Sequence, residues 1–157
     1  LRSSLDHARS TSPSLRDELD QLRAYLAIME TRMPDRFRAT IDCPEDCLAL
    51  PLAPMLIQPL VENAIKHGIE PSARGGELVL RARLTDDALE VEVCDSGVGL
   101  NRAPAHPGNN GTGIANLRER LVLLYGEEAR LTLDALPECG TRALLRVPRR
   151  ALERPPA

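Results

Sequence analysis

The feature that most restricts the fold is a pair of segments in which apolar and polar residues alternate on either side of a turn. Residues 78–84 and 89–93 alternate in this way, and Asp86-Asp87 forms the turn between them. A period of two is that of a β-strand with one buried face, so the pattern predicts a hairpin. The residues on its buried face would be Leu78, Leu80, Ala82, Leu84, Leu89, Val91 and Val93.

Two segments with helical periodicity lie on either side of this hairpin in the sequence. Residues 14–33 should form a helix, with Ser14 as the N-cap and Asp17 and Glu18 in the first turn. Residues 112–126 should form another. Their apolar stripes would be Leu15, Leu19, Leu22, Leu26 and Met29 in the first helix, and Ile114, Leu117, Leu121 and Leu124 in the second.

A third helix is expected over residues 53–67, although Pro59 falls inside it. Proline removes a backbone donor and clashes with the carbonyl four residues earlier, so the helix either kinks there or begins near Gln58. We expect the kinked helix, ended by Gly68.

A strand at residues 36–42 and a second hairpin, 129–136 with 141–147, complete the expected elements. Helices gathered beside such a sheet predict an α+β fold. The expected form is a two-layer α/β sandwich with a mixed, mostly antiparallel sheet covered by about three helices. The polar segment 96–111 is expected to be a long loop, of the kind that is often functional.

Composition excludes several classes of function. The 157 residues suit one domain, and with one Phe, two Tyr and no Trp they lack the aromatic platforms used to stack on nucleic-acid bases. A net charge of -3 gives no general attraction to nucleic acids. The four cysteines form no C-x-x-C pair, which favours reduced thiols over zinc. No apolar run is long enough to span a membrane.

One helix face carries three polar side chains. Asn63, Lys66 and His67 are spaced i, i+3 and i+4, so they project from the same side of the expected helix. An amide oxygen suits a hard cation and an ammonium suits an anion. The face is therefore a candidate for half of a Mg-nucleotide site, with an ordinary solvated surface as the alternative.

Three glycine-containing segments could supply the other half. Asp95-Ser96-Gly97-Val98-Gly99 follows a strand, where a carboxylate can accept from an exocyclic amine and glycines let a flat ring approach. Residues 108–113 run into a helix that starts near Thr112, and the N-terminus of such a helix can hold phosphate. Gly140-Thr141 opens the last strand. Taken alone, each is equally typical of a turn or a linker.

In this order, the segments resemble the ATP-binding fold shared by gyrase, heat-shock protein 90, MutL proteins and histidine kinases, known as the Bergerat fold. The QPLVENAIKHG segment at 58–68 resembles most closely the sensor histidine kinases of the LytS/YehU type. So do GIANLRERL at 113–121, Tyr125-Gly126 and residues 22–32. The resemblance covers roughly residues 15–148.

This resemblance implies ATP and Mg²⁺ as ligands. Asp95 would bind the adenine amino group, Gly97 and Gly99 would line the ring pocket, and Thr141 would support adenine through water. Asn63 would coordinate Mg²⁺.

Around the phosphates, the resemblance places Lys66 and His67 near the phosphates or the ribose. Gly111-Thr112-Gly113 would flank the phosphates.

Gyrase-like relatives use E-x-x-x-N, with the Glu as a general base, but Pro59 stands four residues before Asn63. Glu62 is a candidate base, although an adjacent residue points about 100° away on a helix. The expected catalytic residues are therefore Glu62, as the candidate base, and Asn63, as the Mg²⁺ ligand. The alternatives are an ATPase or an anti-sigma-type serine kinase of the same fold, and a non-catalytic nucleotide-binding or dimerisation module.

No histidine here stands in the H-F-x-F-N setting of a LytS-type phosphoacceptor, since His7 and His106 lie in other contexts. The resemblance therefore implies a catalytic fragment of a two-component sensor histidine kinase, which transfers the ATP γ-phosphoryl to a histidine outside this chain. It divides the chain into the end of a helical dimerisation or linker segment (1–33), a catalytic domain (34–150) and a tail (151–157).

The implied partners are the phosphoacceptor segment of the same full-length kinase and a response regulator, for which the LytTR DNA-binding class is a candidate. A homodimer in the full-length protein and no direct nucleic-acid binding are expected. The implied location is the cytoplasmic side of a membrane-anchored sensor.

Overall fold

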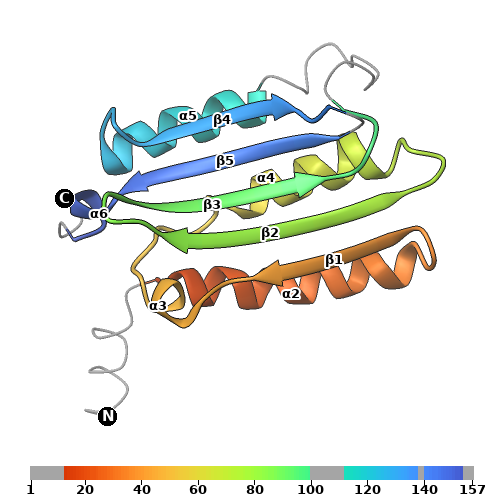
Figure 1. Cartoon of the computed structure of the whole chain (residues 1–157), viewed down its shortest axis with the longest axis horizontal. Helices are drawn as coiled ribbons and strands as arrows, with labels where there is room; N and C mark the ends of the chain where they lie inside the picture. Colours follow the sequence, from red (N-terminus) through yellow and green to blue (C-terminus); the bar gives the residue numbers. More distant parts are fainter. Residues whose placement is uncertain (1–12, 100–111, 138–139, 154–157) are drawn as a thin grey trace.

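The computed structural model describes residues 13–99, 112–137 and 140–153. They form one five-stranded sheet whose helices pack behind one face (Figure 1). The strands are ordered β1-β2-β3-β5-β4, and β1–β2 is the parallel pair among otherwise antiparallel neighbours. The predicted α+β sandwich is confirmed. Its elements are α2 (Leu15–Arg32), β1 (Phe37–Asp42), α3 (Glu45–Leu48), α4 (Gln58–Asn63), η1 (Ala64–Ile69), β2 (Gly76–Leu84), β3 (Ala88–Asp95), α5 (Thr112–Tyr125), β4 (Arg130–Ala135), β5 (Thr141–Pro148) and α6 (Arg149–Leu152).

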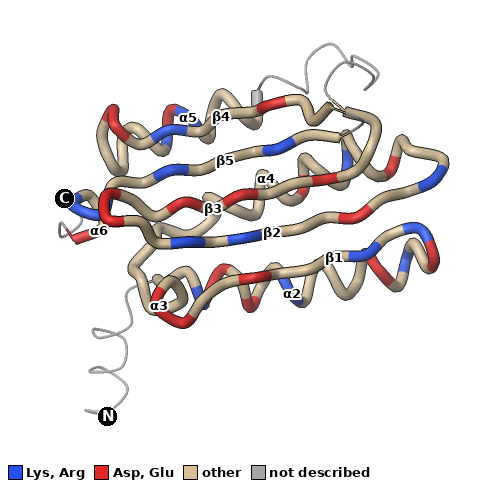
Figure 2. Tube along the Cα trace, viewed as in Figure 1, with Lys and Arg blue, Asp and Glu red and all other residues tan. Residues whose placement is uncertain are grey.

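The two faces of the sheet differ as the alternation predicted. The inward residues of β2 and β3 are buried, apart from Leu84 at the strand end, which is partly buried. On the outer face Arg83 lies opposite Glu90 in the β2–β3 register and pairs with it at 2.5 Å. Arg142 of β5 pairs with Glu92 at 3.1 Å. Charged residues of both signs recur along these strands in Figure 2, so this face is suited to water.

Helix α2 begins where its cap predicted. Ser14 and Asp17 form a reciprocal capping box, in which each side chain accepts from the other residue's backbone N–H. The predicted apolar stripe is buried, and it belongs to the same core as the sheet. Helix α2 is therefore packed as an integral part of the sandwich.

The predicted kinked helix over 53–67 is wrong. Helix α4 begins at Gln58, and Pro59 lies in its first turn. A backbone N–H in the first turn has no acceptor within the helix, so a proline there removes no intrahelical hydrogen bond. Gly68 does not end the helix, because the chain continues as a π-helix, η1, through Ile69. The wider π-helical turn occurs in the segment that carries His67 and Gly68.

Helix α5 buries three of the four predicted stripe residues, but Leu124 is 45% exposed, so that part of the prediction is wrong. The neighbouring Leu123 is 87% exposed. A short helix that the sequence did not predict, α6, buries Ala151 and Leu152 against the sheet.

The thiols of Cys43, Cys47 and Cys94 are free, and Cys139 lies outside the described residues. Within the described ranges no cluster of candidate metal ligands occurs. No helix in the described part is both long and apolar enough to cross a bilayer.

Candidate functional site

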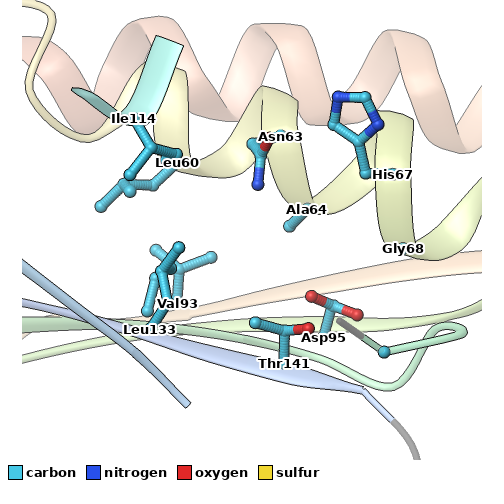
Figure 3. Close-up of a pocket in the computed structure, with 12 residues that line it drawn as sticks. Leu60, Asn63, Ala64, His67, Gly68, Val93, Asp95, Ile114, Leu133 and Thr141 are labelled. Carbon is cyan, nitrogen blue, oxygen red and sulfur yellow. The ribbon is translucent and has the colours of Figure 1, made fainter. Parts of the chain in front are cut away.

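A pocket of about 140 Å³ lies between the helical run α4–η1 and strands β3, β4 and β5 (Figure 3). Asn63 and His67 line it from the helical side, and Asp95 and Thr141 line it from the strands. Gly99 also lines it. Five of the predicted site residues, which are separate in sequence, therefore meet in one cavity.

Asp95 ends strand β3 and is 4% exposed. The Gly97 N–H donates to its Oδ1 at 3.0 Å, and Thr141 is its register partner on β5. Burial raises the pKa of Asp95 to about 6, against the opposing effect of the Gly97 and Thr141 backbone N–H groups. Because this carboxylate is buried away from water, it can accept a hydrogen bond from a donor that enters the pocket.

The backbone around Asp95 packs closely against η1. A Cβ on Gly97 would lie 2.0 Å from the Gly68 carbonyl oxygen, and the Val98 N–H donates to that same oxygen at 2.9 Å. A Cβ on Gly140 would lie 2.0 Å from the Asp95 carbonyl oxygen. Gly97 thus lets the end of β3 meet η1, and Gly140 lets it meet the chain that enters β5, without an intervening side chain.

Asn63 and His67 are both partly exposed on the helical wall. In Figure 3 the Asn63 amide extends toward the strands, while the His67 ring turns away from Asp95. Asn63 is therefore the residue of this wall whose polar group faces the cavity.

Apolar side chains make up most of the remaining lining, and no sequence signal assigned them to the site. They are Leu60, Ala64, Val93, Ile114, Leu133 and Ala143. Alternation placed Val93 on the buried face of the sheet and helical periodicity placed Ile114 in the stripe of α5, but no sequence signal distinguished the part of these surfaces left open to a ligand. Gly68 was likewise predicted only as a helix end.

The other predicted site residues lie away from this cavity. Glu62 is exposed and accepts a hydrogen bond from Gln58 Nε2 at 3.0 Å, and Lys66 is exposed. Gly97 packs beneath the pocket, against η1.

Of the glycine-rich segment before α5, Gly111 lies outside the described residues, and Thr112 is the first residue of α5. Gly113 is exposed, beside a separate shallow depression that Met55 and Pro59 also line. His7 and His106 also lie outside the described residues.

Comparisons with known proteins agree with this architecture. Residues 52–151 match the family described as histidine kinase-, DNA gyrase B- and HSP90-like ATPase. The sensor protein LytS of Staphylococcus saprophyticus is 35% identical to this chain, and the similarity covers 97% of the chain. The chain spans 27% of the length of that protein.

Two solved structures share the fold. The histidine kinase domain of the blue-light activated kinase from Erythrobacter litoralis EL346 superposes with a TM-score of 0.65 and 20% identity, covering 86% of this chain and 61% of that one. Histidine kinase ThkA, in complex with response regulator TrrA, superposes with a TM-score of 0.65 and 13% identity, covering 98% of this chain and 47% of that one. The chain belongs to the histidine kinase-, DNA gyrase B- and HSP90-like ATPase family, and within it resembles the LytS sensor proteins.

Proposed function

We propose that this chain is the ATP-binding catalytic part of a sensor histidine kinase, which transfers the ATP γ-phosphoryl to a histidine outside the chain. Membership of the family and the similarity to LytS support this reading. The observation that carries it is the buried Asp95 carboxylate at one end of an apolar pocket, opposite the helix that bears Asn63.

The lining of the pocket fits an adenine base. Leu60, Val93 and Ile114 offer apolar surface to a flat ring, and Asp95 offers an acceptor to an exocyclic amine. Gly99 and Thr141 stand beside it, where Thr141 would support the ring through water. The cavity is smaller than the ~300 Å³ or more usual for a whole drug-sized ligand, so it would take the base and leave the phosphates outside.

The phosphates would then extend along the helical wall. Asn63 would hold Mg²⁺ through its amide oxygen, and Lys66 and His67 would lie near the phosphates or ribose. Gly111-Thr112-Gly113, at the start of α5, would flank the phosphates through backbone N–H groups. Bound Mg²⁺ would neutralise phosphate charge, and these residues would orient the γ-phosphoryl toward its acceptor.

The position of Glu62 favours transfer over hydrolysis. Its side chain is exposed and hydrogen-bonded to Gln58 instead of lining the pocket. A carboxylate placed there is poorly situated to activate a water next to the phosphates, and this supports a kinase over an ATPase of the same fold. The catalytic role of Glu62 stays a prediction.

The partners follow from the proposed reaction. The phosphoryl acceptor would be a histidine segment elsewhere in the same full-length kinase, acting as a homodimer, and a response regulator would receive the group next. The complex of ThkA with TrrA is consistent with such a partner. A regulator of the LytTR DNA-binding class, and a place on the cytoplasmic side of a membrane-anchored sensor, complete the proposal.

The test compares nucleotides and then transfer. In calorimetric titrations with Mg²⁺, ATP should bind at micromolar to millimolar concentration. GTP should bind much more weakly, because guanine presents a carbonyl where adenine presents an amine. The chain is then mixed with the histidine segment of its full-length protein and γ-labelled ATP, and acid-labile, alkali-stable label on that segment is expected. Equal binding of GTP would reject the adenine assignment, and ATP binding without transfer would favour the non-catalytic module.

A further inference from the structure

A second buried carboxylate takes no part in the pocket. Glu18 of α2 is 4% exposed and stands within the apolar stripe of that helix. Its Oε1 accepts hydrogen bonds from the backbone N–H groups of Ile57 at 2.7 Å and Gln58 at 3.0 Å. A carboxylate in apolar surroundings is costly unless it is bonded, so what it binds indicates its role.

The beginning of α4 lacks a cap of its own. Ile57, at the N-cap position, has helical backbone angles (φ −93°, ψ −37°) and makes no side-chain cap, and Pro59 has no N–H. The first N–H groups of a helix have no intrahelical acceptor and carry partial positive charge. Glu18 therefore supplies, from another helix, the acceptor that the sequence around α4 does not provide.

The same segment is held from its other side by α5. The Arg120 guanidinium donates to the carbonyl oxygens of Pro54 and Met55, the latter at 2.9 Å. The Tyr125 hydroxyl accepts from the Ala53 N–H at 2.7 Å. The chain that enters α4 is thus bonded to α2 through its N–H groups and to α5 largely through its carbonyls.

This capped end leads directly into the pocket wall. Asn63 follows Gln58 by five residues, about 8 Å along a helix, in a run that continues into η1 without a break. Leu60 and Asn63 both line the pocket. A shift or fraying of the helix start would therefore move the Asn63 amide relative to Asp95.

We propose that Glu18 is a positioning residue for the nucleotide site, capping the Asn63 helix from α2 and so holding the Asn63 amide in place relative to Asp95. The inference rests on the proposed function, because the ligand it serves is Mg-ATP. The Glu18 cap couples α2 to the helical wall of the pocket, so a displacement of α2 would displace Asn63 as well.

Two substitutions separate capping from space-filling. Glu18→Gln keeps an oxygen that can accept from the two N–H groups. Its amide nitrogen takes the place of Glu18 Oε2, which has no hydrogen-bond partner among the described residues. Glu18→Leu keeps apolar packing and removes the acceptor. The matched control is Asp20→Asn, which removes a carboxylate from the exposed side of the same helix.

The 157-residue chain is titrated with Mg-ATP, and its melting temperature and amide hydrogen exchange are measured without nucleotide. For Glu18→Leu we expect about tenfold weaker binding, the size of effect expected from a lost cap, and faster exchange at residues 57–61. Glu18→Gln and Asp20→Asn should bind within about twofold of wild type. A purely structural role would lower the melting temperature and leave the affinity of the folded protein unchanged.

Wild-type affinity in folded Glu18→Leu overturns the proposal, and so does an equal loss in Asp20→Asn. If Glu18→Leu does not fold, Glu18→Asp takes its place, because the shorter side chain withdraws the acceptor, and wild-type affinity there has the same meaning. A wild-type chain that binds no ATP refutes the proposed function itself. A wild-type chain that binds, with a variant that binds equally well, refutes only the role of Glu18.

Discussion

Gly68 of η1 lies directly against the Asp95 carboxylate of β3: a Cβ on Gly68 would be 2.5 Å from Asp95 Oδ1. No side chain fits at that distance without a shift of one segment or the other. The two walls of the pocket are therefore set by a contact between backbone and carboxylate.

Gly68→Ala should disturb this contact in both stability and binding. We expect the free energy of unfolding to fall by about 1–3 kcal/mol, as for other overpacked sites, and adenosine binding to weaken because Asp95 is displaced. Urea unfolding and calorimetry measure the two effects. Gly113→Ala is the control for stability, since a Cβ there meets nothing within 4 Å and should not lower the free energy of unfolding. Equal stability changes in the two variants would contradict the contact.

Asp95→Asn should abolish adenosine and ATP binding while making the nucleotide-free protein more stable. The amide has one acceptor oxygen for the Gly97 N–H but no charge to desolvate. The pKa of Asp95, raised to about 6 from 3.8, corresponds to a penalty of up to about 3 kcal/mol at pH 7. Calorimetry at pH 7 tests the loss of binding, and thermal unfolding at pH 7 tests the gain in stability. Unchanged affinity in the variant would remove Asp95 from the proposed adenine site.

The pH dependence of stability follows from the same shift. Because the pKa of Asp95 is higher in the folded state, the folded protein holds a proton that the unfolded chain releases between pH 4 and 6. The contribution of Asp95 to stability is therefore greatest below pH 4 and declines as pH rises through about 6. The pKa of Glu18 is also raised by burial, so wild type alone does not isolate Asp95.

The measurement is the difference in unfolding free energy between Asp95→Asn and wild type at pH 4 and pH 7. It should widen in favour of the variant as pH rises, because Glu18 is common to both proteins. A constant difference across this range would mean that Asp95 titrates at its ordinary pKa in the folded chain.

Much of the sandwich was predictable because its signals are local. The hairpin alternation, the Ser14 cap and the stripe of α2 each specify one element without reference to distant residues. Asn63 and Asp95 were candidates from their residue types and positions, their joint roles with Thr141 came from the resemblance to a known family, and the structure brings all three to one cavity.

The features that could not be predicted from the sequence depend on contacts between elements. The start of α4 at Gln58 is stabilised by Glu18, far away in the chain, and a helix cap supplied by another helix leaves no local pattern. The role of Gly68 depends on its approach to Asp95, whereas in sequence it looked like a helix end. Leu124 fits the helical periodicity but is 45% exposed, and Tyr125 packs against the core at that end of α5 instead.

Helix α2 should contribute to the stability of the sandwich and not act only as a linker. Leu22 is fully buried in the shared core, so Leu22→Ala should lower the free energy of unfolding by about 2–5 kcal/mol. Leu123→Ala is the matched control, because that side chain is 87% exposed and its loss should change stability by less than about 0.5 kcal/mol. Chemical unfolding monitored by circular dichroism measures both. A small effect of Leu22→Ala would support a domain that begins after residue 33.

Asn63→Ala should separate the metal from the base. The Asn63 amide faces the cavity from the helical wall, while the Asp95 carboxylate lies on the strand side. If Asn63 holds Mg²⁺ against the phosphates, the variant should bind adenosine as wild type does and lose the tightening of ATP binding that Mg²⁺ produces. Titrations of adenosine, and of ATP with and without Mg²⁺, measure this. Lys66→Ala is the comparison: its exposed ammonium should affect ATP binding with and without Mg²⁺ alike. A loss of adenosine binding in Asn63→Ala would show instead that the amide shapes the base pocket, and persistent Mg²⁺ dependence would place the metal on other ligands.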